Sequence, residues 1–303
     1  MNTVPGLDVS FWQADVNWRA VRSAGYRFVF IKATEGVGYT DSTFPANWEG
    51  AGAAGLLRGA YCFFHPNQDA RQQAQRFVEA MKERDADGEL PCSIDLEVAD
   101  GISNKKIITC VKTWLDEVEQ GLGRRPLIYS GLSFLETNLV EQGQPPGWLR
   151  DYALWLGWFP KKYVAGMTPL MPHGWSRWTF WQYSGKGRVN GIAAEVDLDL
   201  FNGTMEQLLA FAEANTPASV PVIHVVASGE TLHSIADKYH VSLVELANAN
   251  PQLLTVGMKL SVPGQTPAPN DPPRTYTVKP GDSLYTIASK HGTSIAVLVA
   301  RNR

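Results

Sequence analysis

Short apolar runs alternate with amphipathic segments along the first 213 residues. Runs with the length and composition of buried strands lie at 6–10, 27–33, 57–64, 93–97, 126–129, 152–157, 179–183 and 194–198. Short apolar strands separated by helices are typical of a parallel sheet. Eight of them in this length predict a closed α/β barrel.

Two long helices are predicted between the early strands, at 69–84 and 104–119. In each, apolar side chains recur at the three- and four-residue spacing of one helix face. We expect Gly121 to end the second helix, because glycine is common just after a helix. Little helical pattern separates the last three strands, so the barrel should be irregular.

The chain changes character after residue 213. Residues 215–221 are small, polar and contain proline, and residues 263–273 hold five prolines. Such segments are typical of extended spacers. They predict three domains, at 1–213, 222–263 and 274–303.

The two C-terminal domains repeat each other at a spacing of 52 residues, as Gly229 and Gly281 illustrate. Each copy is predicted to form a strand, a turn and two helices, a small α+β unit. The first copy continues to a closing strand at 258–262, whereas the second ends before one. A lone strand cannot satisfy its backbone hydrogen bonds, so we expect the second copy to be incomplete or poorly stable.

This repeat resembles the LysM module, on its Val-x-x-Gly-Glu/Asp-Thr/Ser-Leu-x-x-Ile-Ala pattern and its Asn-x-Asn ending. The resemblance implies a strand–helix–helix–strand unit that binds glycans containing N-acetylglucosamine. It also implies a groove between the loops at 228–232 and 250–254. The contact residues that it implies are Ser228, Gly229, Glu230, Thr231, Leu232, Asn250 and Pro251.

Acidic residues occur at the ends of three predicted barrel strands. Asp8 lies near the end of the first, Asp95 and Glu97 end the fourth, and Asp197 and Asp199 end the last. Residues two apart on a strand share a face, so Asp95 and Glu97 should project together. The first and last strands of a closed barrel are neighbours, so we expect Asp8 and Asp197 to meet. The active sites of such barrels lie at the carboxyl ends of the strands.

Close carboxyl groups repel each other, which raises the pKa of one of them. Hydrolysis of a glycosidic bond needs such a pair, with one carboxyl protonated and the other charged. The acids therefore predict a glycoside hydrolase.

Composition adds little to this picture. The 303 residues are 44% hydrophobic and 19% charged, as in ordinary globular proteins. A net charge of −3 gives no indication of nucleic acid or membrane as a partner. Cys62, Cys92 and Cys110 form no metal-binding or redox pattern and should be buried. We expect no metal and no cofactor, since no His/Cys cluster and no Gly-rich phosphate loop is found.

The amino-terminal residues lack the basic and apolar regions of a signal peptide. No apolar run of about 18 residues is present, so no membrane insertion is expected. We expect a monomer that is made in the cytoplasm.

Six segments, met in order, are similar to glycoside hydrolase family 25, the muramidase lysozymes. They are 6–13 (GLDVSFWQ), 30–36 (FIKATEG), 59–61 (GAY), 95–97 (DLE), 126–130 (PLIYS) and 181–184 (WQYS). The resemblance implies a barrel of five β/α units followed by three strands. It also implies cleavage of the β-1,4 bond from N-acetylmuramic acid to N-acetylglucosamine in bacterial peptidoglycan.

The resemblance carries catalytic roles to Asp8, Asp95, Glu97 and Asp197. Glu97 is the expected general acid. Asp95 is expected to orient the 2-acetamido group of the substrate, which attacks the anomeric carbon; an aspartyl nucleophile and an inverting water remain alternatives. Many relatives have Tyr-His-Phe after the third strand, whereas this chain has Tyr61-Cys62-Phe63-Phe64-His65. We therefore interpret His65 as a loop histidine, or one that supports the site, and not as a catalytic residue.

Ten tryptophans are many for one chain, and flat aromatic faces bind sugars. The substrate-binding candidates near strand ends are Trp12, Tyr61, Tyr129, Trp155, Trp158, Trp181 and Tyr183.

Two other functions fit the sequence: a glycan-binding protein without activity, and a hydrolase of chitin-like oligosaccharides, which LysM modules also bind. A wall-degrading enzyme without an export signal resembles a phage endolysin. A bacterial enzyme exported by other means is the alternative.

Overall fold

The computed structural model describes residues 2–84, 88–214, 231–238, 246, 259–261, 275–279, 282 and 284–291. The chain divides into two compact units, Met1–Val220 and Pro221–Arg303. The first unit holds the barrel and the second holds the repeated segments.

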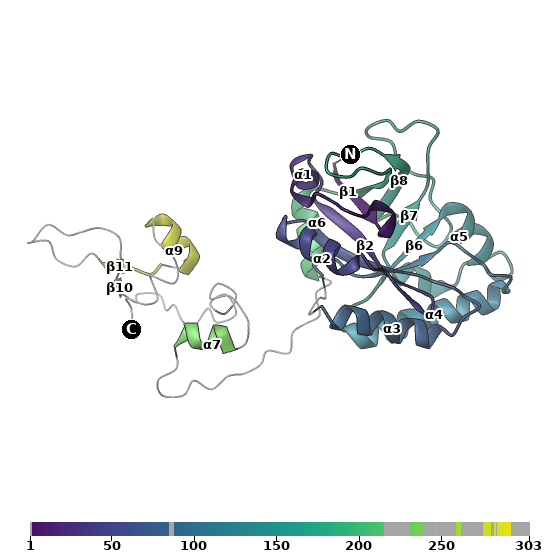
Figure 1. Ribbon diagram of the computed structural model, residues 1–303, viewed down its shortest axis with the longest axis horizontal. Coiled ribbons are helices and arrows are strands. Elements are labelled where there is room, and N and C mark those ends of the chain that lie inside the picture. The colour runs from purple at the N-terminus through teal and green to yellow at the C-terminus, as the bar shows by residue number, and fades with distance from the viewer. Residues whose placement is uncertain are drawn as a thin grey trace, which may run out of the picture. The chain divides into compact units, whose positions relative to one another are not determined.

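Eight strands of the first unit close into a barrel (Figure 1). They are β1 (Thr3–Val9), β2 (Phe28–Glu35), β4 (Leu57–Phe63), β5 (Ser93–Leu96), β6 (Leu127–Gly131), β7 (Leu154–Gly157), β8 (Phe180–Gly187) and β9 (Val196–Asn202). Strand β1 pairs with β2 in parallel and with β9 antiparallel, which completes the ring. The short strand β3 (Tyr39–Thr40) forms a hairpin with β2 outside the ring.

Helices follow each of the first five barrel strands. They are α1 (Trp18–Ser23), α2 (Phe44–Ala53), α3 (Ala70–Lys82), α4 (Asn104–Leu122) and α5 (Leu132–Asn138). The short 3-10 helices η1 (Phe11–Gln13) and η2 (Gly147–Asp151) follow β1 and precede β7, and α6 (Met205–Ala214) follows β9. This order confirms the predicted irregular barrel of five β/α units and three strands.

The predicted end of the second long helix was wrong. Helix α4 continues through Gly121 to Leu122, and Gly123 ends it in the left-handed conformation, at φ 68°. Gly121 instead marks a close approach to α3. A Cβ at that position would lie 2.8 Å from the side chain of Val78.

The direction of the last strand also differs from the prediction. Strand β9 runs antiparallel to both β8 and β1, so Asp197 lies near its beginning rather than its end. A parallel crossover needs a dozen or more residues. Only residues 188–195 connect β8 to β9. The amino-terminal end of β9 therefore reaches the rim at which the parallel strands end.

Aromatic side chains fill the inside of the barrel. Phe30 stacks on Trp155 at a centroid distance of 4.3 Å, and Phe28 meets Phe180 at 5.1 Å. Gly59, the register partner of Phe30, leaves the space for its ring, because a Cβ at Gly59 would lie 2.4 Å from it. The barrel interior is therefore a packed core.

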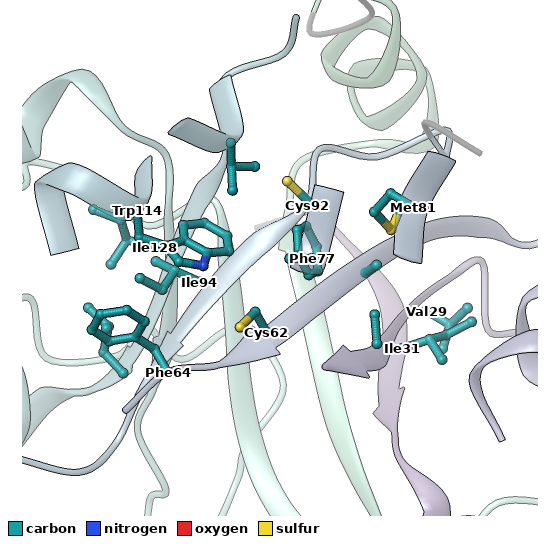
Figure 2. Close-up of a cluster of buried hydrophobic side chains, with 14 of the residues drawn as sticks. Val29, Ile31, Cys62, Phe64, Phe77, Met81, Cys92, Ile94, Trp114 and Ile128 are labelled. Atoms are coloured by element: carbon teal, nitrogen blue, oxygen red, sulfur yellow. The ribbon is translucent and has the colours of Figure 1, made fainter. Parts of the chain in front are cut away.

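A second core lies between the strands and the outer helices (Figure 2). Phe77 and Met81 of α3 and Trp114 of α4 are buried in it. Cys62 and Cys92 belong to the same layer (Figure 2). All three cysteines of the chain are buried, as predicted.

The described part of the second unit contains helices α7 (Leu232–Lys238) and α9 (Leu284–Lys290), which occupy equivalent positions in the two repeats. Strand β10 (Lys259–Ser261), the closing strand of the first repeat, pairs antiparallel with β11 (Thr275–Thr277), the opening strand of the second. This pairing supplies β11 with a ladder partner.

Of the residues implied for LysM glycan binding, Thr231 and Leu232 are described. The Thr231 hydroxyl oxygen accepts a hydrogen bond from the backbone N–H of Ser234, at 3.1 Å, and so caps α7. The other five implied contacts, at 228–230 and 250–251, lie outside the described residues.

Candidate active site

Four acids from three distant segments of the chain line one pocket of about 710 Å³. Asp8 comes from β1, Asp95 from β5, Glu97 from just beyond β5, and Asp197 from β9. Since the carboxyl ends of parallel strands meet at one rim, β1 and β5 bring their acids to the same side of the barrel. The reversed direction of β9 adds Asp197 to this rim.

Asp8 and Asp197 are register partners across the seam that closes the barrel. Beneath them lies Asp199, which is fully buried and accepts a hydrogen bond from Trp155 Nε1 at 2.7 Å. Burial raises the pKa of Asp8 well above its ordinary value, and the charges of Asp197 and Asp199 raise it further. Burial raises the pKa of Asp199 to about 8 and that of Asp197 to about 6.

The sequence indicated Asp199 as an acid at the end of the last strand, but not as a site residue. The signal that could have identified it is its spacing of two from Asp197, which places both on one face of β9.

Asp95 and Glu97 differ in their access to the pocket. The Asp95 side chain is buried, with 4% of its surface exposed, whereas solvent reaches the side chain of Glu97. Burial, and then the charge of Glu97, raise the pKa of Asp95 well above its ordinary value, against the opposing charge of Lys32. The pKa of Glu97 is also raised, because the walls of the pocket desolvate its carboxyl even though solvent reaches it. This pair therefore retains a proton at higher pH than ordinary carboxyls do.

Lys32 is a cation within this acidic pocket that the sequence did not identify. Its Nζ lies 2.6 Å from Glu35 Oε2 and 4.9 Å from the centre of the Phe63 ring. Its charge favours the ionised form of Asp95.

His65 lies beside this pair rather than in the pocket lining. Its Nδ1 is 2.9 Å from Asp100 Oδ2, and its Nε2 is 3.3 Å from Glu35 Oε1. This placement fits the interpretation of His65 as a loop histidine.

Four of the aromatic candidates line the pocket: Trp12, Tyr61, Tyr129 and Trp155. Trp12 is 73% exposed, so its ring is available to a ligand. Phe159, which follows β7 and is 57% exposed, also lines the pocket and was missed in the sequence.

Trp158, Trp181 and Tyr183 were predicted to bind substrate but lie outside the pocket lining. Trp181 is fully buried, and its Nε1 donates to the carbonyl oxygen of Trp158 at 2.7 Å. The Tyr183 ring packs against Tyr163 at 4.4 Å. Because side chains alternate along a strand, it is the residue between them, Gln182, that faces the acids.

Gln182 connects two residues of the pocket. Its Nε2 donates to Asp8 Oδ2 at 2.7 Å, and its Oε1 accepts from the Tyr129 hydroxyl at 2.6 Å. Gln182 is 4% exposed and Tyr129 is 6% exposed.

Among the described residues, no group of three or more His, Cys, Asp or Glu side chains is arranged to hold a metal ion. Within the same residues, none of the helices combines the length and apolarity needed to cross a bilayer.

A closed β/α barrel that holds clustered carboxyls and exposed aromatic rings in one pocket has the groups that a glycoside hydrolase needs. Residues 7–192 match the model of glycosyl hydrolases family 25, and the chain belongs to this family. Residues 224–263 and 276–303 each match the LysM domain.

Two bacterial proteins and one solved structure are similar to this chain over about 70% of its length. The chain is 38% identical to the uncharacterized protein YegX of Escherichia coli over 218 residues, which covers 70% of this chain and 74% of the relative. It is 36% identical to Lysozyme M1 of Streptomyces globisporus over 221 residues, covering 69% and 71%. It is similar in structure to a bacterial lysozyme from Streptomyces coelicolor, at 33% identity and a TM-score of 0.62, covering 71% of this chain and all of that one.

Proposed function

We propose that this protein is an N-acetylmuramidase, a lysozyme that cleaves the β-1,4 bond between N-acetylmuramic acid and N-acetylglucosamine in bacterial peptidoglycan. One observation carries the proposal: Asp8, Asp95, Glu97 and Asp197 line a single pocket beside exposed aromatic rings. Lysozyme M1 and the Streptomyces coelicolor lysozyme, which the chain resembles, are named for this class of activity.

Glu97 is the general acid in this proposal. Its carboxyl is exposed in the pocket, so it can reach a glycosidic oxygen, whereas Asp95 lies deeper. Its raised pKa keeps it protonated at a pH at which an ordinary glutamate is charged. Transfer of this proton to the glycosidic oxygen accompanies cleavage of the bond to the anomeric carbon.

Asp95 orients the 2-acetamido group of the substrate, whose carbonyl oxygen attacks the anomeric carbon as the leaving sugar departs. When Glu97 is protonated, its charge no longer raises the pKa of Asp95. The charge of Lys32, which opposes the effect of burial, then favours an ionised Asp95 that can accept the acetamido N–H. A water molecule then opens the cyclic intermediate, and the ionised Glu97 takes its proton. Asp8 and Asp197 stabilise the positive charge that develops at the anomeric carbon.

We also propose that the chain acts as a monomer and that its domains, at 1–213, 222–263 and 274–303, divide catalysis from wall binding. All four acids come from one chain, so the pocket needs no second copy. The LysM matches at 224–263 and 276–303 support attachment to N-acetylglucosamine-containing glycan.

The test is mass spectrometry of purified peptidoglycan digested by the full chain, with Glu97→Gln as the matched control. N-acetylmuramic acid at the new reducing ends is the expected result. Glu97→Gln should fold normally and lose about 10²- to 10⁴-fold in rate, as expected for loss of a general acid. N-acetylglucosamine at the new reducing ends, or undiminished activity of the variant, would contradict the proposal.

A further inference from the structure

A second cavity, of about 430 Å³, lies at the amino-terminal ends of β7 and β8. Leu154 begins β7, Thr179 directly precedes β8, and both line this cavity. Gly157, at the carboxyl end of β7, lines the acidic pocket instead, and the two cavities share no lining residue. The second cavity, hereafter the basal cavity, is therefore a separate site with a volume typical of ligand pockets.

Aromatic side chains form part of the walls of the basal cavity. Trp175 and Phe211 line it and are half-buried, so part of each ring stays available for apolar contacts. The Trp175 Nε1 donates to the backbone carbonyl oxygen of Tyr152 at 2.8 Å, which fixes the orientation of the indole ring. The cavity thus offers a preformed apolar surface.

Three charged side chains also line the basal cavity: Arg150, Asp151 and Arg177. All three are exposed, and none of these side chains has a hydrogen bond or ion pair with another described residue. A guanidinium group can bind a carboxylate through two parallel N–H···O hydrogen bonds. The lining therefore offers two groups that suit carboxylates and one that suits an amine.

Charged neighbours outside the lining are already paired. Arg125, which donates to the backbone carbonyl oxygen of Asp151 at 3.3 Å, lies 3.1 Å from the carboxylate of Glu119. His173, next to the lining residue Gly174, lies 2.7 Å from the carboxylate of Glu136. The charge pattern of the cavity is therefore set by its own two arginines and one aspartate.

We propose that the basal cavity binds a peptide stem of peptidoglycan, with carboxylates of the peptide on Arg150 and Arg177 and its amine on Asp151. The stems that branch from N-acetylmuramic acid carry several carboxylates and, where they are not cross-linked, one free amine, which complements this lining. The inference rests on the proposed function, because a peptidoglycan hydrolase meets such peptides on its substrate. Binding here attaches the catalytic barrel to the wall and leaves the acidic pocket open.

The experiment is a ¹H–¹⁵N NMR titration of the full chain that follows the indole signal of Trp175, assigned with Trp175→Phe. The probe is the disaccharide N-acetylglucosaminyl-N-acetylmuramic acid with its tetrapeptide. This probe contains no bond from N-acetylmuramic acid to N-acetylglucosamine, so the enzyme does not cleave it.

The Trp175 signal should shift saturably with this probe. A disaccharide of N-acetylglucosamine, which has neither peptide nor carboxylate, should leave the signal in place. Because the reporter lies in the basal cavity, binding at the acidic pocket or at the LysM modules does not imitate the result. No saturable shift with the peptide, or an equal shift with the neutral disaccharide, would overturn the proposal.

The double variant Arg150→Gln/Arg177→Gln removes both positive charges and should weaken binding of the probe by about tenfold. Arg19→Gln is the matched control, because Arg19 on α1 is exposed, lines neither cavity and should leave the Kd unchanged. An unchanged Kd in the double variant would overturn the proposal. Arg177→Gln alone should weaken binding by about threefold and replaces the double variant if that does not fold.

Asp151→Asn tests the contact with the amine. It should weaken binding of the free-amine probe by about threefold and should not weaken binding of a probe whose amine is acetylated. Equal effects on the two probes would overturn the assignment of the amine to Asp151.

The NMR readout does not require catalysis. An inactive enzyme, or N-acetylglucosamine at the new reducing ends, would contradict the proposed function, while an arginine-dependent shift of the Trp175 signal would still establish the peptide site. Conversely, a normal muramidase whose Trp175 signal does not respond to the probe would overturn only the peptide site.

Discussion

Asp8 and Asp197 face each other as register partners between β1 and β9, the one antiparallel seam that β1 makes in the barrel. Their carboxyls share the pocket with Glu97. This arrangement concentrates negative charge where a glycosidase develops positive charge, and it also holds protons on the neighbouring carboxyls.

Removal of the Asp197 charge should move the pH dependence of the enzyme. The pKa of Asp197 is raised to about 6, so above that pH Asp197 is charged and repels the charge of Glu97. In Asp197→Asn the pKa of Glu97 should fall, and the alkaline limb of kcat/KM should shift by about one unit to lower pH. Glu195→Gln, a nearby exposed carboxylate paired with Arg188, is the control. An alkaline limb unchanged from wild type in Asp197→Asn would contradict this coupling.

The buried Asp199 should make the native protein less stable as pH rises. Its pKa is about 8 in the folded protein against 3.8 for an ordinary aspartate, so the native state holds a proton that the unfolded chain releases. Stability is therefore lost as pH rises between these two values. Asp199→Asn should remove this loss, on the order of a few kcal/mol.

Calorimetric melting of both proteins at several pH values between about 4 and 8 measures this effect. The difference in Tm between variant and wild type should grow with pH. A constant difference across the range would show that Asp199 does not titrate in this way.

Trp12 should contribute to binding of the glycan and not to stability. It lines the pocket and is 73% exposed, so Trp12→Ala should raise KM for long glycan strands by roughly tenfold while Tm stays unchanged. Leu170→Ala, at a residue that is 61% exposed and outside the pocket lining, is the control for loss of an exposed apolar side chain. If the KM of Trp12→Ala equals that of Leu170→Ala, Trp12 does not contribute to glycan binding.

Gly59 should be irreplaceable for packing. A Cβ at this position would lie 2.4 Å from the Phe30 ring and 3.1 Å from the Pro91 carbonyl oxygen. Gly59→Ala should cost about 1–3 kcal/mol in the free energy of unfolding, measured with urea. Gly38→Ala, where nothing lies within 4 Å, should cost far less. Equal losses in the two variants would argue against overpacking as the cause.

Deletion of residues 215–303 should separate catalysis from wall attachment. The remaining residues lie within the first compact unit, so cleavage of short soluble glycans should persist. Lysis of whole walls should fall by about 100-fold at low enzyme concentration, because attached modules raise the local concentration of the enzyme. Turbidity of a wall suspension provides the measurement, and equal lysis by both forms would refute the anchoring role.

Much of this protein follows from local sequence. The alternation of apolar runs and amphipathic segments determined the barrel strands and helices, and the 52-residue repeat placed α7 and α9 at equivalent positions. The acids at strand ends were visible as well, because residues such as Asp95 directly follow a buried run. Local periodicity suffices for such features, since it reflects the geometry of a single strand or helix.

Tertiary structure decided the rest. Side chains alternate along a strand, so the sequence indicated that Trp181 and Tyr183 share one face of β8 and that Gln182 lies on the other. Because a barrel strand is covered on both faces, the sequence did not reveal that the face of Gln182 is the one toward the acids. The direction of β9 depended on its pairing with β1 and β8. The placement of Lys32 and Asp199 in or beneath the pocket likewise depends on strands that meet only when the barrel closes, because contacts between distant segments are set by packing of the whole chain.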